Sequence, residues 1–578
     1  MIRNKILFTV ITLTAVLTAV SYFLLTEKKD FTAEALEAED GLIASLASPY
    51  NSKAMYDEIF DNLPQDERTQ EAVYAGIVSH HLLAKDQIAR FYNKISSDKI
   101  QTIVLLSPDH YNHFFEPGIL AYTSKAPWNT PYGELETDKD AINGLLDANI
   151  VNSKSSAMGL EHGIYTQIPF IKKFFPNAKI VPLVINSSLQ YGDFTQLGEK
   201  LKNLDQENSL LIVSSDFSHD STQDQAAQND ANSIDELKNI GSADIKNISS
   251  DCKQCLAVMQ TYLSDRDLKF NATDSMNSFD ISGADSESVT SYVFGYYTAK
   301  TDFQILFTGD LMFDRGIRHY AKKAGGNEFI FQKIRPLLLN QDMVISNLEG
   351  PITDNPSKSS GTQPGSPNNY IFTFDPSVAR TLWYENIRLV GLGNNHILNF
   401  GSDGEKETRG YLETSGVSFF GSPDGDRTII KTVQGVKIAF VGYNEFSGST
   451  ALEQSQTITE IQKLKGKVDF IIVFCHWDVE YQPEPTEATK TLAHQFINAG
   501  ADIIIGSHPH VIQSTETYNN KKIYYSLGNF VFDQYFDENV RNGMGVILKI
   551  NLKTKSIQFE ELNFYLDTGG QTIIRQNQ

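Results

Sequence analysis

Cysteine is scarce in this sequence, with three residues in 578: Cys252, Cys255 and Cys475. Three cysteines cannot form the disulfide framework that holds small secreted domains together. Cys252 and Cys255 are spaced C-x-x-C, which leaves a redox pair, a local disulfide, half of a zinc site or two ordinary buried thiols as interpretations. The chain has no second C-x-x-C, which argues against a structural zinc site. Cys475 lies in an apolar run and is expected in a core.

Basic residues are also in short supply. Lysine and arginine number 49 against 71 aspartates and glutamates, and the formal net charge is -22. A phosphate backbone binds to a basic surface, so we expect no nucleic acid partner. Divalent cations are not excluded, because carboxylates attract them. A hydrophobic content of 41% over this length indicates two or three folded domains.

The N-terminal segment lacks a small-residue cleavage site and a lipid-attachment cysteine. Residues 6–25 carry no charge and are long enough to cross a bilayer as a helix, whereas the apolar core of a cleaved signal is shorter. We therefore predict an uncleaved anchor within residues 1–30 and an acidic spacer over 31–70. The predicted location is the cell membrane, single-pass, with the soluble domains extracytoplasmic. A buried soluble helix is the alternative for residues 6–25.

Two α/β patterns follow, at residues 71–300 and 301–578. In both, short apolar runs typical of buried strands alternate with amphipathic segments typical of helices. Open α/β sheets bind their ligands at the carboxyl ends of the strands. The predicted fold class is therefore α/β in two domains, with any functional site at the strand ends.

Five apolar runs of the second half each end in residues that bind metals. The densest case is ADIIIGSHPH at 501–510, where an isoleucine run stops at Gly506 and two histidines flank Pro509. Imidazole is a common ligand of borderline metals, and the proline stiffens the segment. The alternative is a strand followed by a polar turn whose histidines face solvent.

Together these strand ends predict a dinuclear centre. Two divalent cations need a bridging carboxylate and several imidazole or amide ligands, and they would polarise a phosphoryl or carbonyl oxygen and activate water. The expected residues are Asp310 and His510 for the first ion, Glu349 as the bridge, Asn395, His476 and His508 for the second ion, and His396 for proton handling beside the leaving group.

These motifs, in combination, also resemble a known family. GD, SNLEGP, NNH, CHWDVEY, GADIIIGSHPH and YSLGNFVF, spread over about residues 303–550, resemble the CapA family of capsule poly-γ-glutamate synthesis proteins. The resemblance implies a calcineurin-like metallophosphatase fold, which is a four-layer α/β sandwich, with one or two ions of Mn, Zn or Fe. It also implies an anionic envelope polymer or its precursor as substrate and the capsule-synthesis machinery as a partner.

Three positions depart from the expected patterns. Met312 stands where metallophosphoesterases have the histidine of D-x-H, and Glu349 stands where they have aspartate. Asn399 replaces the aspartate that CapA sequences have after NNH, so a weaker contact to His396 is expected. These departures leave open a site with one ion, or a metal-free domain that only binds polymer.

Two further side chains and one loop of the second half are candidates for substrate contact. Arg315 follows the first motif, where it would contact phosphate or carboxylate unless it forms an ordinary surface ion pair. Asn529 lies in a turn near the predicted site. Residues 355–369, NPSKSSGTQPGSPNN, are too polar to pack and are expected to form a mobile loop, as a gating lid or an ordinary insertion.

Strands of the first half also end in histidine. SPDH, EHGIYTQIPF and VSSDFSH, within about residues 73–300, resemble the Memo-like family, also called AmmeMemoRadiSam system protein B. That fold is similar to the class III extradiol dioxygenases, which bind non-haem iron with two histidines and a carboxylate. The resemblance implies Fe or another metal, and it implies these roles: His80, His110 and Asp280 as ligands, His219 as acid/base, and Glu161 with His162 beside the substrate.

The first half leaves two questions open. A one-residue shift of the alignment would put His81 in the place of His80. The domain would bind metal, or it would keep the fold for binding alone.

From these observations we predict a membrane-anchored envelope protein whose second domain is a metal-dependent hydrolase or transferase. Its substrate would be an anionic polymer of the capsule or poly-γ-glutamate type. The alternative is a non-catalytic scaffold that binds polymer during capsule assembly or export. An iron-dependent oxidative activity of the first domain is a third possibility.

Overall fold

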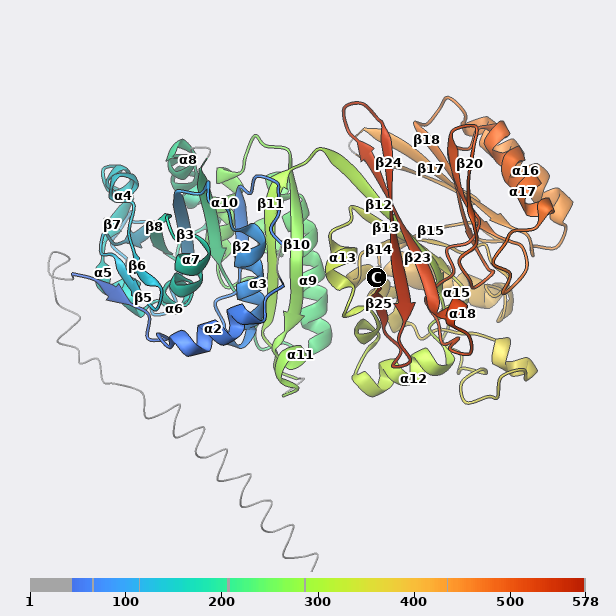
Figure 1. Ribbon diagram of the computed structural model, residues 1–578, viewed down its shortest axis with the longest axis horizontal. Coiled ribbons are helices and arrows are strands. Elements are labelled where there is room, and N and C mark those ends of the chain that lie inside the picture. The colour runs from blue at the N-terminus through green and yellow to red at the C-terminus, as the bar shows by residue number, and fades with distance from the viewer. Residues whose placement is uncertain are drawn as a thin grey trace, which may run out of the picture. The chain divides into compact units, whose positions relative to one another are not determined.

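The computed structural model, shown in Figure 1, describes residues 44–64, 67–113, 115–204, 208–284, 287–433 and 435–575. The predicted anchor at residues 6–25 lies outside the described residues, as do residues 31–43, 65 and 66 of the predicted spacer. In the part that is described, no helix is both long enough and apolar enough to cross a bilayer.

The described residues form two compact units. The first comprises the described residues up to Arg68, with Ser96–Ser215 and Gln254–Tyr262, and the second comprises Thr69–Ile95, Asp216–Lys253 and the described residues from Leu263 onward. Both units mix helices with strands, which confirms the predicted α/β class.

The first unit is built on five strands. Strand β3 runs parallel to β8 and β9, and β4 is antiparallel to β8 and parallel to β7. Strands β3, β8 and β9 are almost continuously apolar, as expected where both faces of a sheet are covered. In order of position they are β9 (Ser209–Ser214), β3 (Thr102–Pro108), β8 (Lys179–Ile185), β4 (Ala121–Thr123) and β7 (Val151–Ser153).

A small sheet and several helices complete the first unit. The sheet consists of β1 (Leu46–Ala47), β5 (Trp128–Thr130) and β6 (Gly133–Leu135). The helices are α2 (Lys53–Asp61), α4 (Lys139–Leu146), α5 (Ser155–Leu160), α6 (His162–Tyr165), α7 (Ile168–Phe174), η3 (Tyr191–Phe194), α8 (Thr195–Leu204) and α10 (Lys253–Tyr262), of which Lys253 belongs to the second unit.

The second unit begins with three antiparallel strands. They are β10 (Leu268–Asn277), β11 (Ser291–Ala299) and β2 (Ala75–Val78), with β11 between the other two. The accompanying helices are η2 (Leu82–Ala84), α3 (Lys85–Ile95), α9 (Gln223–Lys238), η4 (Ile240–Ser242), η5 (Ile245–Asn247) and α11 (Ser278–Ser282).

Two larger sheets follow in the second unit. The first has four parallel strands and an antiparallel continuation: β15 (Ser418–Phe420), β14 (Ile387–Gly391), β13 (Met343–Leu348), β12 (Asp302–Leu311), β23 (Asn542–Asn551), β24 (Ile557–Leu566) and β25 (Thr572–Ile574), with β22 (Asn529–Val531) also paired to β12. The second runs β16 (Thr428–Val433), β17 (Val436–Asn444), β18 (Phe470–His476), β19 (Ile503–Ser507), β21 (Lys521–Tyr524) and β20 (Thr515–Tyr518).

Helices cover the outer faces of these two sheets. The first sheet packs against α12 (Arg315–Ala324), η6 (Asn327–Phe331), α13 (Arg335–Leu339), α14 (Ser377–Tyr384) and α15 (Gly401–Thr414). The second packs against α16 (Thr450–Leu464) and α17 (Glu487–Ala499), which are labelled in Figure 1. The short elements η7 (Pro367–Tyr370) and α18 (Glu538–Arg541) lie in connecting segments.

Alternation along the strands explains the layering. In β12, Ile305 and Phe307 join the core between the sheets, while Leu306 joins the core under the helices. In β18, Phe474 faces the core between the sheets, and Val473 faces α16 and α17. Successive side chains of a strand point to opposite faces, so each sheet contributes to two cores. The result is helix, sheet, sheet and helix, the four layers that the family resemblance implies.

Candidate metal centres

The predicted ligands of the second half lie at the carboxyl ends of parallel strands. Asp310 is the penultimate residue of β12, and Glu349 directly follows β13. His476 ends β18, and His508 directly follows β19. Parallel neighbours end at the same edge of a sheet, so each sheet brings its own pair together.

These ligands form two groups that share one residue. Asp310, Glu349 and His510 offer ligand atoms within 4.8 Å of one another, and so do Glu349, His476 and His508. All five side chains are buried. Glu349 belongs to both groups, which is the position of a bridging carboxylate between two ions.

The environment of Glu349 fits a cation. Its carboxylate is fully buried, and neither oxygen has a hydrogen-bond partner in the structure. Burial raises the pKa of Glu349 well above its usual value. An unpaired buried carboxylate is unfavourable, so the site is arranged for added positive charge. His510 supplies some of that charge, with Nε2 3.6 Å from Oε1 of Glu349.

In the second group, two ring nitrogens and an amide oxygen lie close together. Nε2 of His476 lies 2.9 Å from Oδ1 of Asn395 and 3.2 Å from Nδ1 of His508. The hydroxyl of Ser507 donates to the carbonyl of Cys475 and lies 3.0 Å from Nδ1 of His476, and the side-chain amide nitrogen of Asn347 lies 3.3 Å from the same atom. Burial lowers the pKa of His476 well below its usual value and that of His508 to about 3, so both rings are neutral. Neutral nitrogens beside an amide oxygen suit a divalent ion.

Asn529 orients His510. It was predicted as a substrate contact, and the structure places its side chain in the interior, fully buried. Its amide nitrogen donates to Gln534, to the carbonyl of Val540 and to that of His510, which turns Oδ1 toward Nδ1 of His510 at 3.0 Å. This contact keeps the proton on Nδ1 and directs Nε2 to the site. Burial alone would lower the pKa of His510, but Glu349 and Asp310 raise it to about 9.

The backbone around the two histidines is unusual. His508 and His510 have φ angles of 96° and 58°, a region that side-chain-bearing residues seldom occupy. Such strain persists where the surrounding structure fixes it and is common at functional sites. A close approach on the other side also fixes the site, because a Cβ on Gly309 would lie 1.8 Å from the carbonyl oxygen of Gly528. That approach lets the amide of Asp310 donate to Gly528 at 3.1 Å.

His396 faces Glu349 as a neutral ring. Its Nε2 lies 3.8 Å from Oε1 of Glu349, and its Nδ1 lies 3.2 Å from Oδ1 of Asn399. Because Oδ1 of Asn399 also accepts from the amide of Phe372 at 2.8 Å, Nδ1 of His396 is the donor and Nε2 keeps its lone pair. Burial lowers the pKa of His396 to about 4. The contact expected from the family aspartate is therefore made here by an amide.

Two neighbours of the site have structural partners. Met312 is fully buried, and its sulfur accepts from the amide of Asp314 at 3.0 Å, so it offers no ligand. Arg315, a predicted substrate contact, pairs with Asp533 and donates to Oδ1 of Asn369 at 3.1 Å. Arg315 nevertheless lines a cavity beside the metal centre.

The loop at residues 355–369 is held by polar contacts. We expected this loop to be too polar to pack. In the structure Ser359 is fully buried and donates to Oδ2 of Asp314 at 2.8 Å. The amide of Asn369 donates to Oγ1 of Thr362 at 3.0 Å. Hydrogen bonds to a buried carboxylate replace the apolar contacts that the sequence lacks.

In the first half, the acidic partners of His80 are two aspartates. Nε2 of His80 lies 3.2 Å from Oδ2 of Asp251 and 3.5 Å from Oδ2 of Asp216. These three residues form a group able to hold a metal. His219 lies near them, with Nε2 3.8 Å from Asp251, whose hydrogen bond raises the pKa of His219.

Asp280 was predicted as the third ligand, but the structure places Asp216 and Asp251, and not Asp280, beside His80. Asp280 accepts from the amide of Asn277 at 2.9 Å and completes the N-terminal cap of α11. The sequence reasoning missed Asp216 and Asp251, although Asp216 lies inside the SSDFSH motif. The structure also disagrees with the alternative that His81 takes the place of His80, because His81 caps η2 and stacks on Tyr292.

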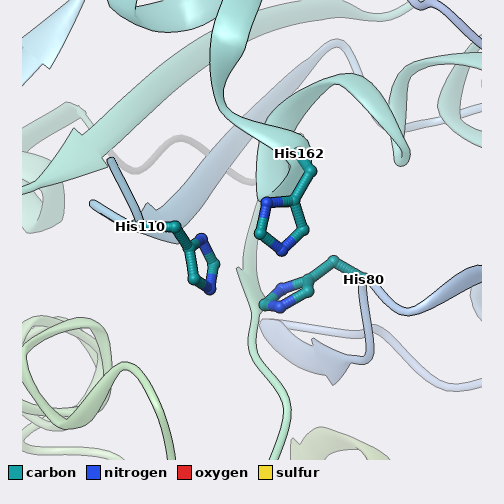
Figure 2. Close-up of side chains that lie close together, drawn as sticks. All are labelled: His80, His110 and His162. Carbon is teal, nitrogen blue, oxygen red and sulfur yellow. The ribbon is translucent and has the colours of Figure 1, made fainter. Parts of the chain in front are cut away.

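Glu161 orients the other predicted ligand of the first half. Its Oε1 lies 2.6 Å from Nδ1 of His110, and its Oε2 accepts from the amide of His110 at 3.0 Å. Glu161, predicted beside the substrate, is fully buried and positions the ring of His110. The ring of His162 lies 4.0 Å from that of His110 (Figure 2).

The cysteines have two different states. Cys252 and Cys255 are disulfide-bonded, which selects one of the interpretations of C-x-x-C. Cys475 is free and buried in the core, as expected.

Comparisons with known proteins match the two halves separately. Residues 47–296 match the family model of Memo-like proteins, and residues 304–534 match that of the bacterial capsule synthesis protein PGA_cap. Both resemblances inferred from the sequence motifs are thereby confirmed.

Curated relatives give the same division. The capsule biosynthesis protein CapA of Bacillus anthracis is 30% identical over 245 residues, which is 39% of this chain and 59% of that protein. The PGA biosynthesis protein CapA of Bacillus subtilis is 32% identical over 244 residues, 39% of this chain and 63% of that protein. A MEMO1 family protein of Methanococcoides burtonii is 27% identical over 202 residues, 34% of this chain and 73% of that protein. The chain thus spans about 60% of the length of the CapA relatives it matches.

Proposed function

We propose that the capsule-synthesis segment, joined in this chain to a Memo-like segment, is a metal-dependent hydrolase or transferase. Its substrate would be an anionic envelope polymer of the capsule or poly-γ-glutamate type, or the linkage or precursor of that polymer. The observation that carries the proposal is the shared position of Glu349 between two groups of buried ligands. The names of the CapA relatives support the polymer class.

The donor set favours Mn, Zn or Fe, because imidazole, carboxylate and amide oxygen together suit borderline divalent ions. Asp310, Glu349 and His510 would hold one ion, and Glu349, His476 and His508 the other, with Asn395 beside the second group. When bound, such ions polarise a phosphoryl or carbonyl oxygen and activate water.

The chain itself supplies proton handling and orientation. His396 presents the unprotonated Nε2 toward the site, so it accepts a proton there or shares one with a reacting oxygen. Asn529 and Ser507 keep the rings of His510 and His476 in place through the nitrogens that face away from the site.

Hydrolysis of bis(4-nitrophenyl) phosphate and of poly-γ-glutamate, with and without Mn²⁺, tests this function. Asp310→Asn and His396→Ala are expected to lower turnover by about a hundredfold or more, as the loss of a ligand or an acid/base group does. The control is Leu452→Ala, which removes an exposed side chain of α16. Equal activity in all four proteins would refute the assignment.

A non-catalytic scaffold is the second candidate, and Met312 is the observation in its favour. The buried methionine removes one histidine from the expected ligands of the first ion. Polymer binding without turnover, unchanged in His396→Ala, would establish this alternative.

For the first half we propose a separate metal centre around His80, Asp216 and Asp251, with iron favoured by the mixture of imidazole and carboxylate. His110, oriented by Glu161, stays a predicted metal ligand of the first half. Loss of iron from His80→Ala, with no change of metal at the second-half centre, is the expected result of elemental analysis.

We also propose that residues 6–25 anchor the protein in the cell membrane, with both halves outside the cytoplasm and in contact with capsule-synthesis proteins. Cell fractionation of the full chain and of a chain lacking residues 1–30 tests the anchor. Recovery of both chains in the soluble fraction would contradict it.

A further inference from the structure

A cavity of about 480 Å³ opens beside the metal centre of the second half. Its lining includes Arg315, Tyr370, Tyr481 and Phe536. The ring of Tyr481 lies 6.1 Å from that of His510, which places the cavity next to a metal ligand. A substrate held at the metal centre would therefore extend into this cavity.

Three aromatic side chains line the cavity and remain exposed. Tyr370 is 50% exposed, Tyr481 40% and Phe536 70%. The rings of Tyr481 and Phe536 are 5.5 Å apart at 80°, so they form the two sides of a corner. Gln534 donates to the hydroxyl of Tyr481 at 3.1 Å and holds that ring. Exposed aromatic rings gathered at one place indicate a binding surface.

The charge of the cavity does not match a polyanion. Among the described residues that line it, Arg315 is the single lysine or arginine and His319 the single histidine, and Asp533, which also lines it, pairs with Arg315. The guanidinium is further occupied by Oδ1 of Asn369 at 3.1 Å. Recognition of carboxylate or phosphate groups needs unpaired cations, so the anionic part of a substrate would not gain by lying here.

Part of the remaining lining is polar and uncharged. Ser360, Thr362 and Asn369 come from the loop at 355–369 and bring hydroxyl and amide groups to the rim. The side-chain amide of Asn369 donates to Oγ1 of Thr362 at 3.0 Å, so this rim is a polar edge at which hydroxyl groups of a ligand can add further hydrogen bonds. A suitable ligand combines a flat face of C–H groups for the rings with a rim of hydroxyl groups for the loop.

A sugar ring has this combination, since its axial C–H groups form an apolar face and its hydroxyl groups form a polar edge. We propose that the cavity is a subsite for a neutral sugar of an envelope glycan, seated beside the metal centre. The inference deepens the proposed function, on which it rests, by naming a sugar as the part of the substrate next to the reacting bond. The anionic polymer would then be handled where it meets a glycan.

Binding to the full chain treated with a chelator tests the subsite without any need for turnover. The probe is chitotetraose, a neutral oligomer of N-acetylglucosamine, and its binding is measured by isothermal titration calorimetry. Tyr370→Ala and Phe536→Ala are each expected to weaken binding by about tenfold or more. Ile430→Ala and Leu452→Ala are matched controls, because both side chains are exposed but neither lines the cavity.

A decamer of γ-linked glutamate is the competing probe, and it is expected not to displace chitotetraose. Displacement by the decamer would overturn the proposal in favour of polyanion binding. Absence of chitotetraose binding up to about 10 mM would also overturn it, as would equal losses in the control variants. Sugar binding that persists in a protein with no hydrolase activity would refute the proposed catalysis but not the subsite.

Discussion

Replacing Asn399 by aspartate would convert His396 from a neutral ring into one that titrates. In the present chain, Nδ1 of His396 donates to an amide oxygen at 3.2 Å, and burial lowers the pKa of His396 to about 4. Aspartate would keep the acceptor for His396 and for the amide of Phe372, which donates at 2.8 Å, so the geometry is preserved. The change therefore adds a charge at an existing contact.

The size of the effect follows from that distance. A carboxylate within 4–6 Å raises the pKa of a histidine by about 1–3 units, so His396 is expected to move from about 4 to about 5–7. Each unit corresponds to about 1.4 kcal/mol of differential stabilisation of the imidazolium.

The same change alters the response of stability to acid. The pKa of His396 is lower in the folded protein than the usual value near 6.5, so the unfolded chain takes the proton first as pH falls. The contribution of this residue to the free energy of unfolding is complete above about pH 6.5 and falls by roughly 3 kcal/mol toward pH 4. In Asn399→Asp that loss is expected to shrink to about 2 kcal/mol or less.

Two assays read this out in the metal-free protein. Two-dimensional NMR of the imidazole resonances gives the pKa of His396 directly, and urea unfolding between pH 4 and 7 gives the stability. Asn519→Asp is the control, because it adds the same charge at an exposed turn. A pKa of His396 that stays near 4 in Asn399→Asp would refute the assigned contact.

Three further predictions concern other parts of the chain. Burial raises the pKa of Asp230 to about 7, so the unfolded chain loses this proton first as pH rises. The free energy of unfolding of the wild type, measured in urea, should therefore fall by roughly 4 kcal/mol from pH 4 to 7 relative to that of Asp230→Asn. The same pH dependence in both proteins would contradict this. Asn529→Leu should weaken metal binding about tenfold to a hundredfold through His510, and unchanged affinity in a metal titration would count against its orienting role. Ser359→Ala should lower the free energy of unfolding by about 1 kcal/mol and speed protease cleavage within residues 355–369, because it removes the hydrogen bond to Asp314. Unchanged stability and an unchanged cleavage rate would contradict a role of this bond in holding the loop.

The parts of the fold that could be predicted from sequence are those with local signals. Residues 503–505 are β-branched and are followed by a glycine, so the sequence predicts both the strand and the position of its end. The same pattern recurs at Glu349 and His476, and parallel strands then bring their ends together. The grouping of the ligands therefore followed from local pattern and one rule of topology.

The parts that could not be predicted depend on contacts far apart in the sequence. Asp251 meets His80 across 171 residues, and no local pattern distinguishes it from Asp280, which caps a helix. Asn529 lies in a sequence typical of an exposed turn, but the three acceptors around its amide nitrogen lie inside the protein. The loop at 355–369 has too few apolar residues for a core and is held by one buried carboxylate, that of Asp314.

Metal content of the purified chain, after reconstitution with Mn, Zn or Fe, tests the central claim most directly. Glu349→Gln and His508→Ala are compared with wild type, and His494→Ala is the control, because His494 pairs with Glu516 outside the site. The shared position of Glu349 predicts that Glu349→Gln loses two ions per chain and His508→Ala loses one, while His494→Ala matches wild type. Equal metal content in all four proteins, or none in wild type, would contradict a dinuclear centre bridged by Glu349.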